Sequence, residues 1–172
     1  VGANALAGFT TGQYNTTVGK DAGTAITTAN YNTFVGAWAG DAVTAGGYNT
    51  VLGFQAFSDA VADSSHTVAI GYQAGKAITS GDGNIMIGAG AGSTTTDVDK
   101  AVIIGQDAGL ANMTSDADGT VAVGYAAGYY ITSGIGNTAV GYTALAGEND
   151  GDRNTAVGYE ALRYQTGTTG TV

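Results

Sequence analysis

A short motif ending in glycine, N-T-x-V-G in its best copies, recurs along the whole of this 172-residue chain. Nine intervals separate the ten closing glycines; seven of them are 17 residues, and the other two are 18 and 19. A unit this short cannot bury a hydrophobic face alone, so successive units must stack on one another. The chain is therefore a repeat array. The closing glycines are Gly2, Gly19, Gly36, Gly53, Gly71, Gly88, Gly105, Gly124, Gly141 and Gly158.

Aligning the units on this glycine brings other positions into register. The preceding residue is aliphatic in every copy, and alanine stands three residues after the glycine in every copy. Asparagine dominates four residues before the glycine. Stacked side-chain amides can hydrogen-bond to one another and to turn backbone. We therefore expect an asparagine ladder along a buried corner of the array.

The stretch that ends at each glycine is rich in β-branched residues and bounded by Gly, Asn and Asp, which predicts a short strand. A second, weaker strand is predicted seven or eight residues past the glycine, as at Ala25-Ile26-Thr27. The predicted fold is all-β: an elongated parallel β-solenoid (β-roll) of about ten 17-residue coils, in one domain spanning residues 1–172. One short helical turn per coil, as at Glu160-Ala161-Leu162-Arg163, is the alternative to the second strand.

The predicted first strand carries no charged residue in any coil. Alternate strand residues face opposite ways, so we expect the aliphatic residue before the glycine to build the chain's own core. The residue before it lies on the other face, and a strand that is apolar on both faces is usually buried on both. This second face is predicted to line the axis of a homo-oligomer, a trimer or a filament; a tolerable solvent face is the alternative. The predicted interface residues are Phe34, Val51, Met86 and Ile103.

Charge and residue types exclude several classes of function. Fourteen acidic residues against five basic ones give a formal net charge of −9, which would repel nucleic acid and anionic membranes. No run of 18 apolar residues predicts a membrane span. The single histidine, His66, falls at a turn position, and there is no cysteine to act as a nucleophile. We expect neither enzymatic activity nor a cofactor.

Aromatic residues are the candidates for ligand binding. Tyrosine precedes the asparagine in three successive coils, so the rings are expected to form a ladder that stacks on sugar rings. A tryptophan and the Tyr129-Tyr130 pair are further candidates, and packing at corners or between chains is the alternative. The predicted ligand-binding residues are Tyr14, Tyr31, Tyr48 and Trp38.

Pairs of aspartates in turn segments suggest two other kinds of site. Asp150 and Asp152 form the densest acidic cluster with Glu148, and Asp-x-Asp in a turn offers oxygen ligands to calcium. Paired carboxylates also serve glycosidases, and solvated turn acids are the alternative to both. A column of threonines that includes Thr27 and Thr44 suggests ice binding, although other residue types interrupt the column.

Two tandem segments, 137–145 and 154–162, read N-T-A-V-G-Y-x-A-L and resemble the repeats of bacteriophage tail fibres and related bacterial fibre proteins. Segments 67–71 and 120–124 are similar to the head repeats of trimeric autotransporter adhesins. The latter resemblance implies parallel β-rolls packed three together. The former implies an extracellular or virion-borne fibre that attaches to a host.

Both ends of the sequence cut through a repeat, which suggests a segment of a longer fibre or a protomer that joins end to end. The expected function is that of a structural fibre module of a phage tail fibre or bacterial surface appendage. It would give an elongated, multivalent scaffold for attachment to a host or surface, with a cell-surface glycan as a candidate partner. A ligand-binding solenoid, for glycan or ice, is the alternative.

Overall fold

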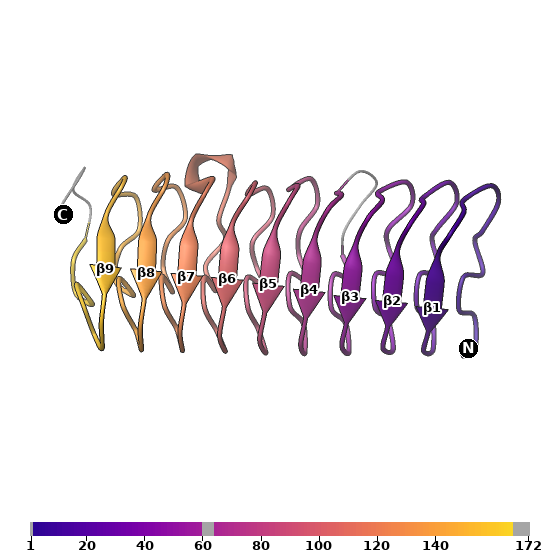
Figure 1. Cartoon of the computed structure of the whole chain (residues 1–172), viewed down its shortest axis with the longest axis horizontal. Coiled ribbons are helices and arrows are strands. Elements are labelled where there is room, and N and C mark those ends of the chain that lie inside the picture. Colours follow the sequence, from indigo (N-terminus) through magenta and orange to yellow (C-terminus); the bar gives the residue numbers. More distant parts are fainter. Residues whose placement is uncertain (1, 60–63, 167–172) are drawn as a thin grey trace.

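A computed structural model describes residues 2–59 and 64–166 of the chain. Nine strands of three residues form one parallel sheet in which the strands follow one another in sequence order (Figure 1). The strands are β1 Thr16–Val18, β2 Thr33–Val35, β3 Thr50–Leu52, β4 Val68–Ile70, β5 Ile85–Ile87, β6 Val102–Ile104, β7 Val121–Val123, β8 Thr138–Val140 and β9 Thr155–Val157.

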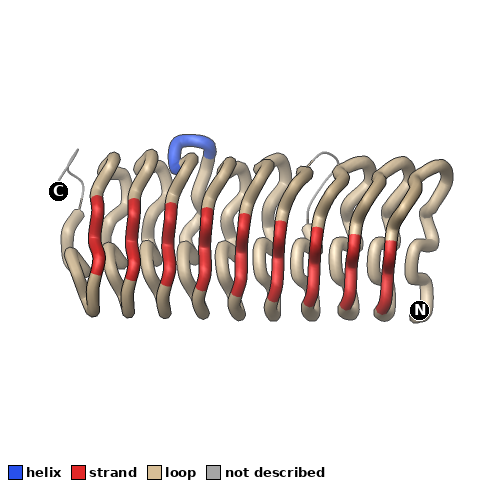
Figure 2. Tube along the Cα trace, in the orientation of Figure 1, coloured by secondary structure: helices blue, strands red, loops and turns tan. Residues whose placement is uncertain are grey.

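The chain winds as a parallel β-solenoid, which confirms the predicted fold. Equivalent residues of successive repeats pair across the sheet, as Thr16 does with Thr33 and Thr33 with Thr50. The strands lie along one side of the rod and the loops return along the other (Figure 2). At about 4.8 Å per step, the eight steps from β1 to β9 span roughly 38 Å.

Two consecutive turns replace the predicted second strand, which is not formed in residues 2–59 or 64–166. The residues two and four positions past the glycine have positive φ, as at Asp21 (55°) and Gly23 (58°). The backbone still donates hydrogen bonds to the next coil here, from Gly23 N to Ala39 O and from Ala25 N to Asp41 O, with an N–O distance of 3.0 Å in both. Hydrogen bonds between coils therefore continue well beyond the sheet.

The alternative of one helical turn per coil is not formed either. Within the described parts of the chain, the only helix is the 3-10 turn η1, Ser115–Ala117, in the longest repeat. Positive φ at every second residue after the glycine interrupts helical geometry, which needs consecutive residues of negative φ. The extra residues of that repeat are accommodated by η1 outside the regular coil.

The middle residue of each strand faces the core of its own chain. Phe34, Val51, Met86 and Ile103 have no exposed surface, so their prediction as oligomer-interface residues is wrong. The coil interior accepts one side chain from each strand, and the turns opposite supply alanine, glycine and larger buried residues such as Ile78. Where the strand residue is large, glycine can stand opposite it: a Cβ at Gly40 would lie 2.6 Å from the Phe34 ring. The aliphatic residue before the glycine, predicted to be in the core, faces outward instead.

The repeat glycine itself is required for the coils to stack. From Gly19 to Gly141 its φ lies between 133° and 141°, a region that other residues rarely adopt. At Gly88, a Cβ would also lie only 2.5 Å from the carbonyl oxygen of Gly105 in the next coil. The same glycine therefore recurs because backbone approaches backbone at this point in every coil.

Candidate functional site

The outward residues of the sheet form an apolar surface, here called the outer sheet face. It consists of the first and third residues of the nine strands, none of which is charged. Exposure reaches 42% at Val18, 47% at Leu52 and 67% at Val157. Its aliphatic members are Val18, Val35, Leu52, Val68, Ile70, Ile85, Ile87, Val102, Ile104, Val121, Val123, Val140 and Val157, and its threonines are Thr16, Thr33, Thr50, Thr138 and Thr155.

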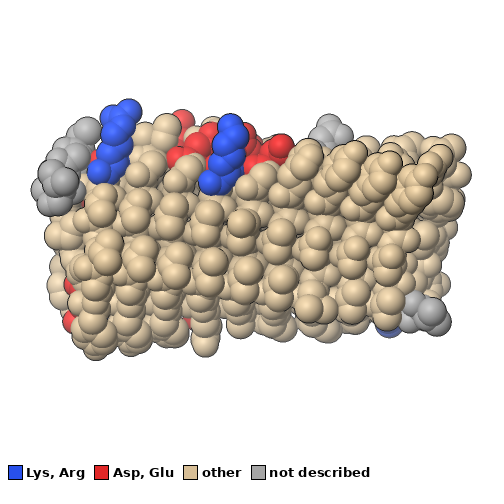
Figure 3. All heavy atoms as spheres, viewed as in Figure 1, with Lys and Arg blue, Asp and Glu red and all other residues tan. Residues whose placement is uncertain are grey.

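Charged side chains lie at the borders of this face rather than on it. Figure 3 shows an uncharged surface over the strands, with most of the visible acidic and basic side chains along the upper edge and a few at the lower edge. A continuous apolar patch of several hundred Å² on a protein surface is often a site of contact with another molecule. The face is therefore the first candidate for a functional surface.

The predicted tyrosine ladder is formed at one border of the sheet. Tyr14, Tyr31 and Tyr48 stack in succession with ring centroids 4.9 Å apart, and His66 continues the stack 5.1 Å beyond Tyr48. Neighbouring rings cover each other's faces, so only ring edges and hydroxyls point outward along the ladder. The predicted stacking of sugar rings on it stays a prediction, with open ring faces restricted to the ladder's ends.

The structure does not add Trp38 to this ladder. Trp38 follows its strand instead of preceding it, and its ring meets Phe54 edge-on at 5.2 Å with the Lys20 ammonium 4.6 Å from its centroid. A second ladder runs along the opposite border, on the side where the strands end and where Trp38 lies, and is formed by Tyr125, Tyr142 and Tyr159, whose centroids lie 5.2 and 5.1 Å apart. Aromatic rings thus follow both borders of the outer sheet face.

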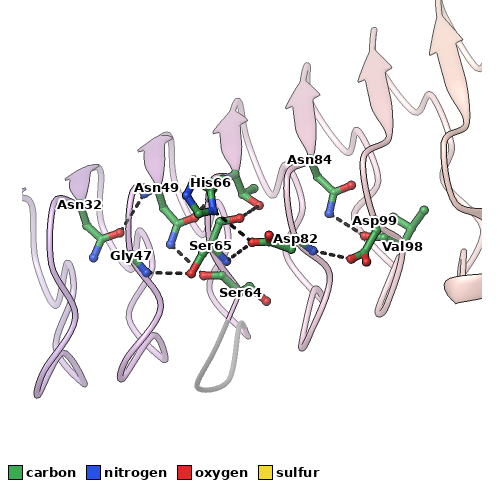
Figure 4. A network of polar contacts seen from close by, with 11 residues as sticks. Asn32, Gly47, Asn49, Ser64, Ser65, His66, Asp82, Asn84, Val98 and Asp99 are labelled. Carbon is green, nitrogen blue, oxygen red and sulfur yellow. Dashed lines mark hydrogen bonds and ion pairs between the residues drawn. The ribbon is translucent and has the colours of Figure 1, made fainter.

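The predicted asparagine ladder is confirmed as a buried corner (Figure 4). Asn49 is typical: its amide nitrogen donates to Ser64 O at 3.0 Å, and its amide oxygen accepts from Thr67 N at 2.9 Å in the next coil. Asn32 and Asn84 make the equivalent bonds in their coils. This column is structural, because its polar atoms satisfy turn backbone that water cannot reach.

Aspartates continue the same corner toward solvent. Asp82 accepts a hydrogen bond from Ser65 N at 3.0 Å, and Asp99 and Asp118 accept from the preceding coil in the same way at 2.7 Å. Asp82 also lies 3.5 Å from His66, whose φ of 56° confirms it as a turn residue. These carboxylates bond the coils together, as does the asparagine beside them.

In the described part of the chain, the structure adds no further ligands to the calcium site predicted at Asp150 and Asp152. Asp152 accepts a hydrogen bond from Ile135 N at 2.9 Å, and Asp150 lies on an exposed turn. Glu148 is fully buried, and its Oε1 accepts from Asn149 N and Gly151 N. Among the residues that the structure describes, no group of three or more acidic, histidine or cysteine side chains could hold a metal ion. Binding of calcium at Asp150 and Asp152 stays a prediction.

The threonine column proposed for ice binding uses its hydroxyls within the rod. Thr10, Thr27 and Thr79 each donate to the carbonyl oxygen of the threonine one coil further on, at 2.7, 3.2 and 3.1 Å. A hydroxyl engaged in this way has its proton committed to the chain. The column therefore offers less to an ordered water lattice than its spacing suggests.

The carboxyl group of Asp41 has an unusually high pKa. Burial raises the pKa of Asp41 to about 6, and the nearby charges of Asp59 and Asp21 add to the effect against an opposing backbone hydrogen bond. Its Oδ1 is buried with no hydrogen-bond partner in the described part of the chain. By contrast, the hydrogen bond from Asn4 lowers the pKa of Asp21, and Lys20 acts in the same direction.

A hollow near the C-terminal end of the rod contains the tyrosine pair Tyr129 and Tyr130, which the sequence suggested as candidates for sugar binding, although the hollow itself was not predicted. It has a volume of about 270 Å³ and is lined by three tyrosines and one arginine together with smaller residues. The sequence signal is a pair of small residues in one coil between bulky pairs at the same positions of its two neighbours. The lining residues are Ala126, Tyr129, Tyr130, Thr143, Ala146, Gly147, Arg163 and Tyr164.

Comparison of the chain with protein families, with curated proteins and with solved structures finds no match. Across residues 2–59 and 64–166, no helix is long and apolar enough to cross a membrane. The surfaces of the rod itself are therefore the guide to its function.

Proposed function

We propose that the chain is a structural fibre module of a phage tail fibre or bacterial surface appendage, outside the cell or on a virion. Its rods associate through the outer sheet face into a homotrimer or filament. The assembly is a stiff, elongated scaffold that presents many copies of each surface feature for attachment to a host or surface.

The observation that carries this proposal is the continuity of the outer sheet face from β1 to β9. A second copy of the chain suits this face because both rods have the same coil spacing, so aliphatic rows of one can lie along those of the other. No strand residue would place a charge in that contact. The acidic residues that give the chain its net charge lie outside the face. At ordinary ionic strength salt largely screens the repulsion between them, so it does not prevent the contact.

The size of the face is consistent with a stable contact. Nine strands at about 4.8 Å, each about 10 Å long, make a flat area of roughly 430 Å². The aromatic ladders at both borders extend it toward the roughly 800 Å² that each partner buries in a standard interface. The tyrosines would then lie at the rim of the contact, where their hydroxyls remain hydrated.

Sedimentation of the purified chain tests the proposal. We expect trimers or longer polymers, whereas a monomer at all concentrations up to the millimolar range would refute association. Changing Ile87→Lys and Ile104→Lys together places two charges at the centre of the face and is expected to give a folded monomer. The matched control is Ala45→Lys, which adds a charge at an exposed loop position and should leave the assembly unchanged.

A further inference from the structure

We propose that the hollow near the C-terminal end is a binding slot for one neutral pyranose ring of a saccharide. The slot is built within a single chain, and its walls and floor come from three successive coils. The biological purpose of this binding rests on the proposed attachment role. The binding itself does not, because it can be measured whether or not the rods associate.

The slot arises because one coil has small residues at two repeat positions where both neighbouring coils have bulky ones. Five and six positions past the repeat glycine, one coil carries Tyr129 and Tyr130, and the coil two steps further carries Arg163 and Tyr164. The coil between them carries only Ala146 and Gly147 at these positions. The neighbouring side chains therefore stand as two walls over a floor of small residues.

The spacing of the walls admits a single ring. Two coil steps separate them by roughly 9.6 Å. A ring inserted between two surfaces needs about 3.5–4.0 Å on each side, or about 7–8 Å in total. A puckered pyranose ring with axial substituents uses the remaining space, whereas a flat aromatic ring leaves a gap. The volume of about 270 Å³ likewise suits one sugar residue, with the rest of the glycan in solvent.

The lining matches the surface of a sugar. A pyranose has an apolar C–H face and a rim of hydroxyls, and the slot offers tyrosine rings for the former. Tyr130 is 58% exposed and Tyr164 80% exposed, so their rings have surface left to cover. For the rim there are tyrosine hydroxyls and the guanidinium of Arg163, which has donors beyond the one that binds Glu160.

A buried hydroxyl beside the slot also lacks a partner. Thr143 is 6% exposed, and its Oγ1 has no hydrogen-bond partner among the described residues. Buried hydroxyls without partners are uncommon and cost free energy, so the position is ready to bond a ligand that enters the slot.

The charge around the slot favours a neutral sugar. Arg163 Nη1 lies 2.7 Å from Glu160 Oε1, which largely balances the only positive charge that lines the slot. The chain as a whole carries −9 and repels anions at a distance. A uronic acid therefore gains less here than the corresponding neutral glycoside.

Floor and wall can be tested separately. Ala146→Tyr should place a bulky side chain between the two walls and fill the slot, while the tyrosines and the arginine of the walls remain. Ser93→Tyr is the matched control, because Ser93 occupies the same position of the repeat three coils earlier and does not line the slot. Tyr164→Ala removes one wall and should weaken binding about tenfold.

Saturation-transfer NMR titrations with methyl glucoside, galactoside, mannoside and N-acetylglucosaminide would measure binding, with methyl glucuronide as the charged comparison. We expect at least one neutral glycoside to bind the native chain and the Ser93→Tyr variant equally, and Ala146→Tyr at least tenfold more weakly. Absence of binding by every glycoside, or equal binding by Ala146→Tyr, would overturn the slot. Tighter binding of the glucuronide would overturn its preference for neutral sugars. Neither result would alter the sedimentation outcome.

Discussion

The repeat glycine offers a direct test of how the coils are held together. Replacing Gly88 by alanine requires a φ of 133° for a residue with a Cβ, which costs about 1–3 kcal/mol. The new Cβ would also lie 2.5 Å from Gly105 O and 2.6 Å from Gly105 C, so the two coils must separate locally. Such overpacking costs about 1–3 kcal/mol. We therefore expect Gly88→Ala to lose about 2–6 kcal/mol of unfolding free energy.

Two glycines separate strain from steric contact. Gly83 lies in the preceding loop with a φ of 69°, and its nearest prospective contact is Lys100 Cγ at 3.7 Å. Gly158 has the repeat conformation at 132°, and its nearest contact is Ala161 Cβ at 3.9 Å. Alanine at either position should cost the strain alone, about 1–3 kcal/mol.

Urea unfolding followed by far-ultraviolet circular dichroism would measure all three variants. In a solenoid each coil contacts only its neighbours, so loosening the joint after Gly88 should also reduce cooperativity. We expect a smaller denaturant dependence or two transitions for Gly88→Ala alone. Equal losses for the three variants, within about 0.5 kcal/mol, would refute the claim that close approach of backbones determines the repeat glycine.

Three further predictions concern the core residue Phe34, the buried carboxylate of Glu148 and the raised pKa of Asp41. Phe34→Ala should cost about 3–5 kcal/mol in urea unfolding, because the ring is fully buried; a loss below 1 kcal/mol would contradict its place in the core. Glu148→Ala should cost about 2–4 kcal/mol by leaving the Asn149 and Gly151 amides without their acceptor, whereas Glu148→Gln keeps an acceptor oxygen and should cost less. The pKa of Asp41 is raised on folding from 3.8 to about 6, so ionisation opposes folding: stability should fall as pH rises from about 4 to 6 and stay lower above that range. Because Asp41 is partly exposed, the effect is on the order of 1 kcal/mol, and a stability–pH profile of Asp41→Asn should lack it.

The fold was predictable because a period of 17 residues has few structural solutions. Stacking, parallel pairing and the position of the strands follow from the repeat glycine and the β-branched residues before it. The buried asparagine corner was predictable for the same reason, since an amide repeated at each coil must bond to its neighbours. The tyrosine ladder followed from three tyrosines at equivalent positions.

The turns and the direction of the strand faces were not predicted correctly. Segments such as Ala25-Ile26-Thr27 look like strands by composition, but positive φ at Asp21 and Gly23 bends the chain before the segment and leaves only single coil-to-coil bonds. Residue type does not reveal positive φ when alanine, threonine or tryptophan adopts it. Both faces of the strand are apolar, so alternation alone could not indicate which one faces inward.

Side-chain volume distinguishes the two faces better than hydrophobicity does. In the inward column, side-chain size varies widely, and in several coils it is exchanged across the core: Phe34 faces Gly40 and Met86 faces Gly92, whereas Ala139 belongs to a coil with the buried Leu145. An interior position can vary from alanine to phenylalanine because other residues of the turns adjust to fill the remaining space, as the buried Ile78 and Ile131 do in the coils of Ala69 and Ala122.

The outward column before the glycine shows no such exchange, since every coil places valine, leucine or isoleucine there. A residue facing only water would have no reason to keep either its aliphatic character or its size. A straight partner lying along the rod would impose both, because one short or bulky side chain would interrupt contact over several coils. The uniform size of this column therefore supports, independently of its exposure, the proposed association of rods through the outer sheet face.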